Sequence, residues 1–424
     1  MLLHVQRALT LLDALQHGAG EASTLALHWR LRKVREATLD LQGKRPEQRV
    51  DLDAMDQLAE ALNVDRLRAY AAWRRSVLAQ RTADWATQEA SARRGVLLAE
   101  RAADDEARLS CQRLVAIAMS HQGDWRTGQV MAQDVLAQAC GLGLRNVQAH
   151  CLNTLGFIAD VQHDVVAALE LFQQTLEINR ETGNQRDEAF GLGNVGMCWA
   201  GLGALTQARK ASEEALQMCR ANGDRTAECA MLCNLSYLAL MQVEDARALS
   251  LARAALEIAL AVEARNMEVS ALICLGDAEL ALGRYGPAQQ AFGQAHAVVL
   301  AIEHPGQHDA TVGQARLAMA QADVRAALQQ VNSLLLHADN GGNFEGVSNP
   351  RLLELTCYQV LAKAGDPRAQ PWLERAHTAL QSTAKAITNA ALRHGLLANI
   401  PEHREIVAAW AASERSSGGT SNTE

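Results

Sequence analysis

The sequence predicts an all-α protein, a superhelix of about eight helix pairs that repeat every forty residues. Two observations support this prediction. The 424-residue chain is 49% hydrophobic but only 4% aromatic, so its core must be built largely from Leu and Ala, which favour helices over strands. Apolar and small residues also recur at one constant interval through the middle of the chain. A disordered chain and an all-β fold are thereby excluded.

Three ladders of residues set the period. The first ladder consists of markers forty residues apart: Trp85, Trp125, Val165, Leu205, Asp245 and Tyr285. Three positions after each of the last five markers stands a small residue: Gly128, Ala168, Ala208, Ala248 or Ala288. The second ladder lies ten residues before these markers, at Val115, Leu155, Val195, Leu235 and Leu275, each followed by Ala, Gly or Ser. The third ladder, Gly143, Gly183 and Gly223, is typical of helix C-termini.

Each unit of forty residues therefore predicts two helices of about fifteen residues joined by a short turn. Where two helices cross closely, a side chain larger than Ala pushes the backbones apart. We therefore expect Gly156, Gly196 and Gly276 of the second ladder to lie between helices. No proline interrupts residues 48–286, and the spacing slips by one residue at Val324.

The repeat resembles a known family. Leu155-Gly156, Ala168 and Phe172, or Leu275-Gly276 with Tyr285, Ala288, Phe292 and Ala295, look like the tetratricopeptide repeat (TPR) consensus stretched from about thirty-four residues to about forty. This resemblance implies TPR-like pairs wound into a right-handed α-α superhelix. Stretched repeats of this kind resemble the helical sensor region of maltose-regulator-like (MalT-like) signalling ATPases.

The C-terminal part carries a second resemblance. Asn349-Pro-Arg, Cys357-Tyr-Gln-Val-Leu and the segment from Ala398 to Trp410 are similar to the tail of large bacterial proteins. In those proteins a class III adenylate cyclase or transcription-factor domain precedes a nucleotide-switch (STAND-type) ATPase and then such repeats. We expect four segments: an irregular helical cap or remnant at 1–27, a TPR-like array at 28–346, a C-terminal helical capping repeat at 347–411, and a disordered tail at 412–424.

Charge and composition narrow the partners and the compartment. With 40 basic and 48 acidic residues the formal charge is -8, which argues against direct binding to nucleic acid. No apolar run approaches the length that spans a bilayer, and the first residues do not resemble a signal peptide, so we expect no membrane partner. The nine cysteines are scattered and mostly apolar in context, which predicts reduced thiols and a cytoplasmic protein.

Motifs that suggest chemistry have simpler explanations. Gly191-Leu-Gly-Asn-Val-Gly196 matches GxGxxG, but it lies inside a predicted helix instead of between a strand and a helix. Cys229 and Cys233 lack two further ligands for zinc and are interpreted as small buried residues. No phosphate-binding GxxxxGK loop, GxSxG or HExxH motif is present. We predict no catalytic residue, cofactor or metal ion, and we do not expect an enzyme.

Binding is expected on the concave face, which the first helix of each pair lines in such arrays. By resemblance to TPR units, the partner-binding residues are Arg113, Asn153, Phe157, Phe190, Asn194, Met197, Asn234, Tyr237 and Asp277. Their amide and apolar groups suit a protein or peptide partner or a small-molecule effector. Asn194 and Asn234 can either bond a partner's backbone or hold a neighbouring turn, and both interpretations stay open.

Two functions fit the sequence. The first is a non-catalytic scaffold or sensor arm of a bacterial signal-transduction or transcription-regulation system, which binds its partner through the concave face. The second is the separated regulatory C-terminal half of a class III adenylate cyclase or STAND-type ATPase regulator, which the irregular first 27 residues suggest. The Lys and Arg residues of the carboxylate clamp found in chaperone-binding TPR proteins are missing, which argues against an acidic C-terminal peptide as ligand.

Overall fold

The computed structural model describes residues 2–14, 21–302, 307–342, 344 and 347–418, and within them it contains only helices and turns. The first helices are α1 (Leu2–Ala14), α2 (Glu21–Gln42), α3 (Arg45–Leu62), α4 (Asp65–Arg81), α5 (Trp85–Arg101), α6 (Asp105–His121) and α7 (Trp125–Gly141). The middle helices are α8 (Arg145–Val161), α9 (Val165–Thr182), α10 (Gln185–Gly201), α11 (Leu205–Asn222), α12 (Arg225–Met241), α13 (Asp245–Ala261) and α14 (Arg265–Ala281). The last are α15 (Tyr285–Ile302), α16 (Gln307–Ala320), α17 (Val324–Asp339), α18 (Pro350–Lys363), α19 (Ala369–Ala386), α20 (Ala390–Ala398) and α21 (Pro401–Gly418).

Thirteen consecutive helices, α3 to α15, begin exactly twenty residues apart, so the predicted period of forty residues is confirmed as two helices per unit. Most of them have 17 or 18 residues instead of about fifteen. The extra residues lie at the helix ends. The ladder residues show where two helices contact each other, whereas the capping residues determine where each helix begins and ends. Asp84, Asp124 and Asp164, for example, accept a hydrogen bond from the backbone N–H three residues later.

The third ladder ends helices as predicted. Gly143, Gly183 and Gly223 have φ of 67° or 68°, in the left-handed region that glycine adopts without strain. Other turns place a non-glycine residue in the same conformation, among them His163 with φ of 62°.

The second ladder lies between helices, also as predicted. A Cβ on Gly156 would approach the Phe172 ring to 2.7 Å, one on Gly196 would approach Ser212 Oγ to 2.9 Å, and one on Gly276 would approach the Phe292 ring to 2.5 Å. Ordinary carbon contacts require at least about 3.5 Å. These positions therefore allow neighbouring helices to pack closely.

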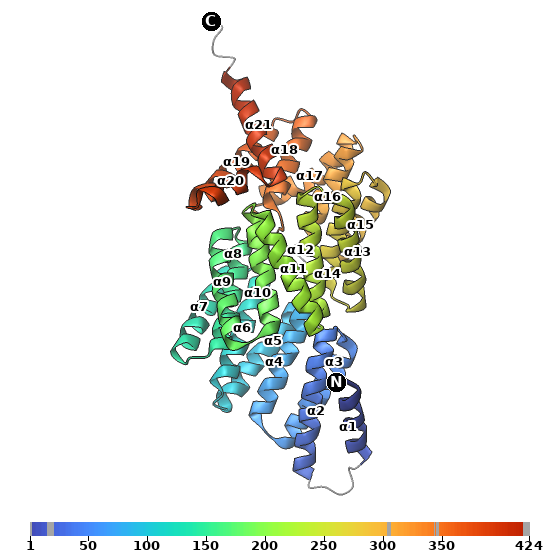
Figure 1. Cartoon of the computed structure of the whole chain (residues 1–424), viewed down its shortest axis with the longest axis vertical. Coiled ribbons are helices and arrows are strands. Elements are labelled where there is room, and N and C mark those ends of the chain that lie inside the picture. The colour runs from blue at the N-terminus through green and yellow to red at the C-terminus, as the bar shows by residue number, and fades with distance from the viewer. Residues whose placement is uncertain (1, 15–20, 303–306, 343, 345–346, 419–424) are drawn as a thin grey trace.

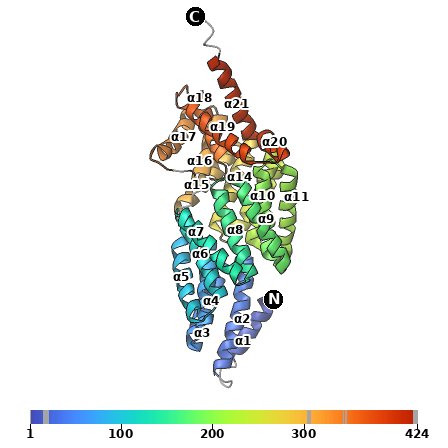
Figure 2. The ribbon, with the colours of Figure 1, turned by 90° about the vertical axis from the view of Figure 1, so that its left-hand side faces the viewer.

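Eight helix pairs, α2/α3 to α16/α17, follow one another, and α18 to α21 continue the stack. Each helix packs on the next in sequence, and the even-numbered helices from α4 to α18 also contact the following even-numbered helix at most steps. Since helices approach more closely on the inner side of a curved stack, the even-numbered helices form the concave wall. Two perpendicular views show an elongated molecule with α1–α4 at one end and α18–α21 at the other (Figure 1 and Figure 2).

The superhelix contacts itself after one turn. A Cβ on Gly43, between α2 and α3, would overlap the side chain of Val262, which follows α13. Arg45 Nη2 donates to Thr226 Oγ1 at 3.2 Å in α12. Towards the other end, Asn399 Nδ2 donates to the carbonyl oxygen of Gly203, after α10, at 2.9 Å. These contacts fix the pitch of the array.

A buried network of charges lies at the first of these contacts. Asp40 in α2 is 2.7 Å from Arg45, 3.2 Å from Arg74 and 3.3 Å from Arg186 of α10. Burial alone would raise the pKa of Asp40, but Arg81 and these three guanidinium groups hold it far below its usual range. The network therefore joins the first pairs to the middle pairs through ionised groups.

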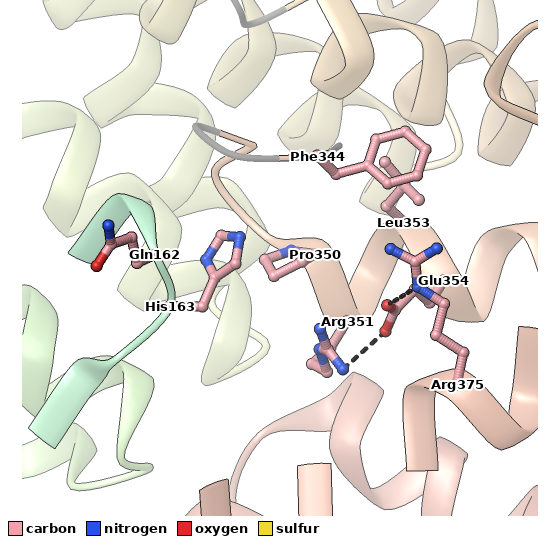
Figure 3. A pocket seen from close by; sticks show the side chains of 8 residues that line it. All are labelled: Gln162, His163, Phe344, Pro350, Arg351, Leu353, Glu354 and Arg375. Atoms are coloured by element: carbon pink, nitrogen blue, oxygen red, sulfur yellow. Dashed lines mark hydrogen bonds and ion pairs between the residues drawn. The ribbon is translucent and has the colours of Figure 1, made fainter. Parts of the chain in front are cut away.

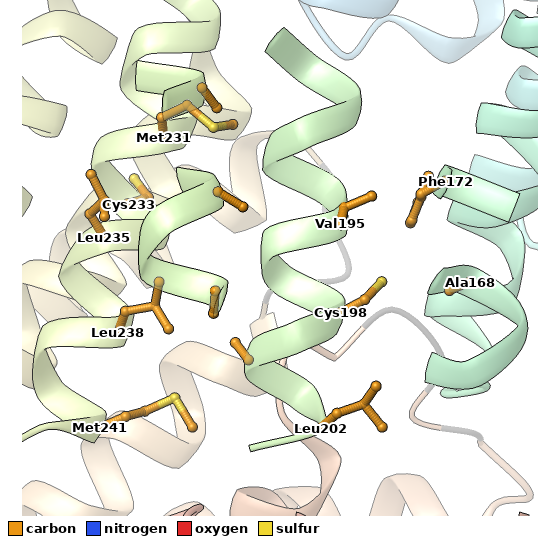
Figure 4. Close-up of a cluster of buried hydrophobic side chains, with 14 of the residues drawn as sticks. Ala168, Phe172, Val195, Cys198, Leu202, Met231, Cys233, Leu235, Leu238 and Met241 are labelled. Carbon is orange, nitrogen blue, oxygen red and sulfur yellow. The ribbon is translucent and has the colours of Figure 1, made fainter. Parts of the chain in front are cut away.

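The largest hydrophobic cluster connects the middle pairs to the C-terminal helices. It contains Phe172 and Val195 together with Leu373, Leu380 and Ile406 of α19 and α21. Val195 and Cys198 of α10 point toward Phe172 and Ala168 of α9 (Figure 4). The boundary expected at residue 28 falls within α2, and α21 extends to Gly418, so the last six residues of the expected tail lie outside the described residues.

Candidate binding site on the concave face

The predicted binding residues lie on five successive inner helices. Arg113 comes from α6, and the others follow on α8, α10, α12 and α14: Asn153, Phe157, Phe190, Asn194, Met197, Asn234, Tyr237 and Asp277. Phe157 and Phe190 are each 37% exposed, which is unusual for large aromatic side chains, and the remaining seven are half-buried.

One row of this wall is polar. Arg113 and Asn153 occupy equivalent positions of α6 and α8, and Asn194 and Asn234 stand one residue later in α10 and α12. Asn194 Nδ2 donates to Asn153 Oδ1 at 3.1 Å, and Arg113 Nη1 donates to Thr154 Oγ1 at 3.4 Å. The side chain of Asn194, on α10, thus bonds the preceding inner helix, α8, and not its own turn. The Asn234 side chain has no hydrogen bond among the described residues. Free amide donors and acceptors are left to face the groove.

A second row runs parallel to the first, one helical turn away. Ile117, Phe157, Met197, Tyr237 and Asp277 are spaced by forty residues, and the first four present apolar or aromatic groups. Residues three or four positions apart lie on the same helix face, so the two rows are neighbours along each inner helix. The wall therefore alternates hydrogen-bonding groups with apolar surface.

Aromatic rings continue this apolar row toward α5, a feature that sequence reasoning missed. The His121 ring stacks on Trp85 at a centroid distance of 4.0 Å and lies 5.4 Å from Phe157. Trp125 lies 6.3 Å from Phe157. The available signal was an interval of 36 residues from Trp85 to His121 and from His121 to Phe157, which the period of forty concealed.

Several charged groups on the wall are accessible to water and yet surrounded by protein. Asp160 of α8 is exposed, and burial still raises its pKa to about 6. Burial lowers the pKa of Arg113, which has no ion-pair partner among the described residues. In both groups the surrounding protein weakens the hydration of the charged form and shifts the pKa toward the neutral form.

His150 and Asp187, on α8 and α10, form an ion pair at the edge of the wall. The Nε2 and Oδ2 atoms are 2.8 Å apart. Burial alone would raise the pKa of Asp187, but the hydrogen bond from His150 lowers it to about 2. His150 is therefore engaged in a structural contact between inner helices.

The C-terminal helices reach the far part of the wall. Asn349, at the start of α18, has its Nδ2 3.4 Å from Tyr237 Oη and also donates to Glu402. Asp277 pairs with Arg316 of α16 at 2.5 Å, although burial raises its pKa. Tyr237 and Asp277 thus contact other parts of the chain, and the stretch of the two rows from Arg113 to Met197 is the candidate binding surface.

The motifs that suggested other chemistry take part in packing. Gly191 to Gly196 lie inside α10, where Gly193 faces Met231 and Gly196 faces Ser212, which confirms their structural interpretation. Cys229 Sγ is 3.2 Å from the carbonyl oxygen of Ala255, and all nine cysteines are unpaired. Within the described residues, no three His, Cys, Asp or Glu side chains gather as metal ligands would. Nor does that part of the chain contain a helix long and apolar enough to cross a membrane.

Comparison with known structures agrees with this geometry. No protein-family model and no curated protein matches the chain. A Rap protein crystallised with Competence and Sporulation Factor superposes with a TM-score of 0.55 at 13% identity, over 81% of this chain and 98% of that one. The fold is a TPR-like α-α superhelix.

Two further solved structures resemble this TPR-like superhelix less closely. Aspartyl phosphate phosphatase F from Bacillus subtilis matches with a TM-score of 0.49 at 10% identity, covering 86% of this chain and 96% of that chain. A signal transduction ATPase with numerous domains and a TPR sensor, from Pyrococcus horikoshii, matches with a TM-score of 0.48 at 14% identity. That match covers 83% of this chain and 52% of the ATPase.

Proposed function

We propose that the chain is a non-catalytic scaffold or sensor arm that binds an extended segment of a protein partner along its concave wall. The observation that supports this most directly is the pair of neighbouring rows on successive inner helices, one largely of amide groups and one of apolar groups that recur every forty residues. An extended peptide has the same division, since its backbone needs hydrogen bonds and its side chains need apolar contacts.

The spacing of the rows suits one peptide conformation in particular. Packed helices lie about 8–10 Å apart. A polyproline II segment has three residues per turn and rises about 3.1 Å per residue, so equivalent residues recur about every 9 Å. Such a segment, crossing the inner helices, places every third side chain on the apolar row and leaves its backbone groups for Asn153, Asn194 and Asn234.

The test is a comparison of two double variants with the wild type. Asn194→Ala with Asn234→Ala removes two amides of the polar row. Asn222→Ala with Asn332→Ala removes one half-buried and one exposed amide of the outer helices α11 and α17 and serves as the control. A protein that purifies with the wild type and the control, and binds the wall variant at least tenfold more weakly, supports the proposal. Equal binding by all three would remove the wall as the site.

The system that the chain serves is a finer part of the same proposal. We place it in bacterial signal transduction or transcription regulation because the repeats resemble the sensor region of MalT-like signalling ATPases and the segments from Asn349 to Trp410 resemble the tail of large bacterial regulators. A cytoplasmic location belongs to this proposal too, since all nine cysteines are free thiols. In the alternative, the chain is the regulatory half of a separated cyclase or STAND-type ATPase. An ATPase or cyclase gene directly upstream would favour the alternative, and unrelated neighbouring genes would argue against it.

A further inference from the structure

A cavity of about 250 Å³ lies between the middle pairs and the C-terminal helices. Gln162 and His163, in the turn between α8 and α9, line one side of it (Figure 3). The other side consists of Phe344 and of Arg351 and neighbouring residues at the start of α18, with Arg375 of α19. Since a water molecule takes about 30 Å³ in the liquid, the space holds a compact organic molecule.

The cavity wall carries more positive than negative charge. Arg351 Nη1 lies 2.9 Å from Glu354 Oε2, and Arg375 Nε donates to Glu354 Oε1 at 3.0 Å. Among the described lining residues, two guanidinium groups therefore share one carboxylate, whose side chain is only 3% exposed. Each guanidinium carries five N–H donors in a fork that matches carboxylate or phosphate oxygens, and one bidentate anion would balance the second positive charge.

The remaining walls add apolar surface and the imidazole of His163. Leu353 is fully buried, Phe344 is 6% exposed, and the Arg375 guanidinium lies 5.5 Å from the Phe344 ring centroid. The imidazole of His163 also lines the cavity.

We propose that this cavity binds a small organic anion, with its carboxylate or phosphate on Arg351 and Arg375 and its apolar part against Phe344 and Leu353. Burial lowers the pKa of Arg351, so its charge is held at a cost that a bound anion reduces. The site is separate from the polar and apolar rows, so this inference does not depend on the proposed function.

Binding here would connect two distant parts of the chain. One wall belongs to the α8–α9 turn, and the other belongs to α18, whose first residues contact Tyr237 on the concave wall. An anion held by both walls stabilises the arrangement in which the C-terminal helices lie against the middle pairs. Such a ligand would act as an effector, because it would stabilise the contact of the C-terminal helices with the middle pairs without occupying the concave wall.

The test uses three probes of nearly equal shape and different charge: benzoate, benzamide and benzamidine. Thermal unfolding of the full chain is followed at increasing probe concentration, since a ligand that binds only the folded state raises the unfolding midpoint in a saturable way. We expect benzoate to raise it, and benzamide and benzamidine to leave it unchanged. An equal response to benzamide, or no response to benzoate, would overturn the proposal.

Three variants locate the site and separate it from a purely structural ion cluster. Arg375 is about half exposed, so Arg375→Gln should fold and should weaken benzoate binding at least tenfold. Glu354→Gln removes the competing carboxylate and should tighten benzoate binding, even where it lowers the stability of the free protein. Arg368→Gln changes an exposed arginine outside the cavity and is the control. A structural cluster would lower stability in the first two variants and leave the benzoate affinity of all three at the wild-type value.

Discussion

Substituting Gly276 by alanine tests the close packing of inner and outer helices. Replacing a mid-helix glycine by alanine stabilises a helix by about 1 kcal/mol when there is room. A Cβ on Gly276, however, would lie 2.5 Å from the Phe292 ring, about 1 Å too close. Phe292 is fully buried, and the same ring atoms also lie close to the Cβ position of Gly313, so the ring has little space to move. Overpacking of this kind costs about 1–3 kcal/mol.

Gly293→Ala is the matched control, because Gly293 is also mid-helix, in α15, and has no heavy atom near its Cβ position. Both variants share the gain in helix propensity, so the difference between their unfolding free energies isolates the overpacking and should be about 1–3 kcal/mol. Urea unfolding followed by circular dichroism measures it. Repeat arrays often unfold in segments, so hydrogen exchange of the amides in α14 to α16 locates the change. If Gly276→Ala stabilised the protein as much as Gly293→Ala, the argument about helix crossing would be wrong.

Three more predictions concern the closure of the superhelix and the charges of the wall. Gly43→Ala should destabilise the protein more than Gly183→Ala, since both have a left-handed backbone but only the first meets a neighbour, and Val262→Ala should relieve the excess in urea unfolding. Arg74→Met leaves the buried carboxylate of Glu36 without its ion-pair partner and should lower the free energy of unfolding by about 3–5 kcal/mol. Asp160→Asn should raise the thermal midpoint at pH 7.5, because the folded-state pKa of about 6 exceeds the unfolded value and ionisation therefore costs stability above it. Its advantage should vanish below about pH 4, where the carboxyl is neutral in both states; an advantage that persists there would point to a cause other than charge.

The stride of the repeat could be read from the sequence because it depends on local contacts. Gly156 packs on Phe172, sixteen residues later, and Gly276 packs on Phe292 at the same interval, so each repeat reports its own crossing. The contact of Gly43 with Val262 could not be found in this way. It depends on the rotation that accumulates over eleven helices, and a small change per pair moves the meeting point to another turn.

The candidate site was predictable to a similar degree. The two rows on the inner helices could be predicted from the period of forty residues, because equivalent or neighbouring positions on successive inner helices lie on the same wall. The covering of Tyr237 by Asn349 was not predictable, because it is a contact between segments 112 residues apart. The cavity at His163 was missed for the same reason, since five of its eight lining residues come from α18 and α19.

The two closures bear on how the wall can bind. An open array of helix pairs changes its pitch with little resistance, since each pair contacts only its neighbours, and a ligand that fixes the pitch must offset that lost freedom. In this chain the ionic network of Asp40 and the contact of Asn399 with Gly203 already hold the pitch. The wall between α6 and α10 is therefore held close to one shape before a partner arrives. On binding, only the partner segment then loses conformational entropy. Variants that loosen the network, such as Arg74→Met, should therefore weaken binding at the wall, although Arg74 does not line the wall.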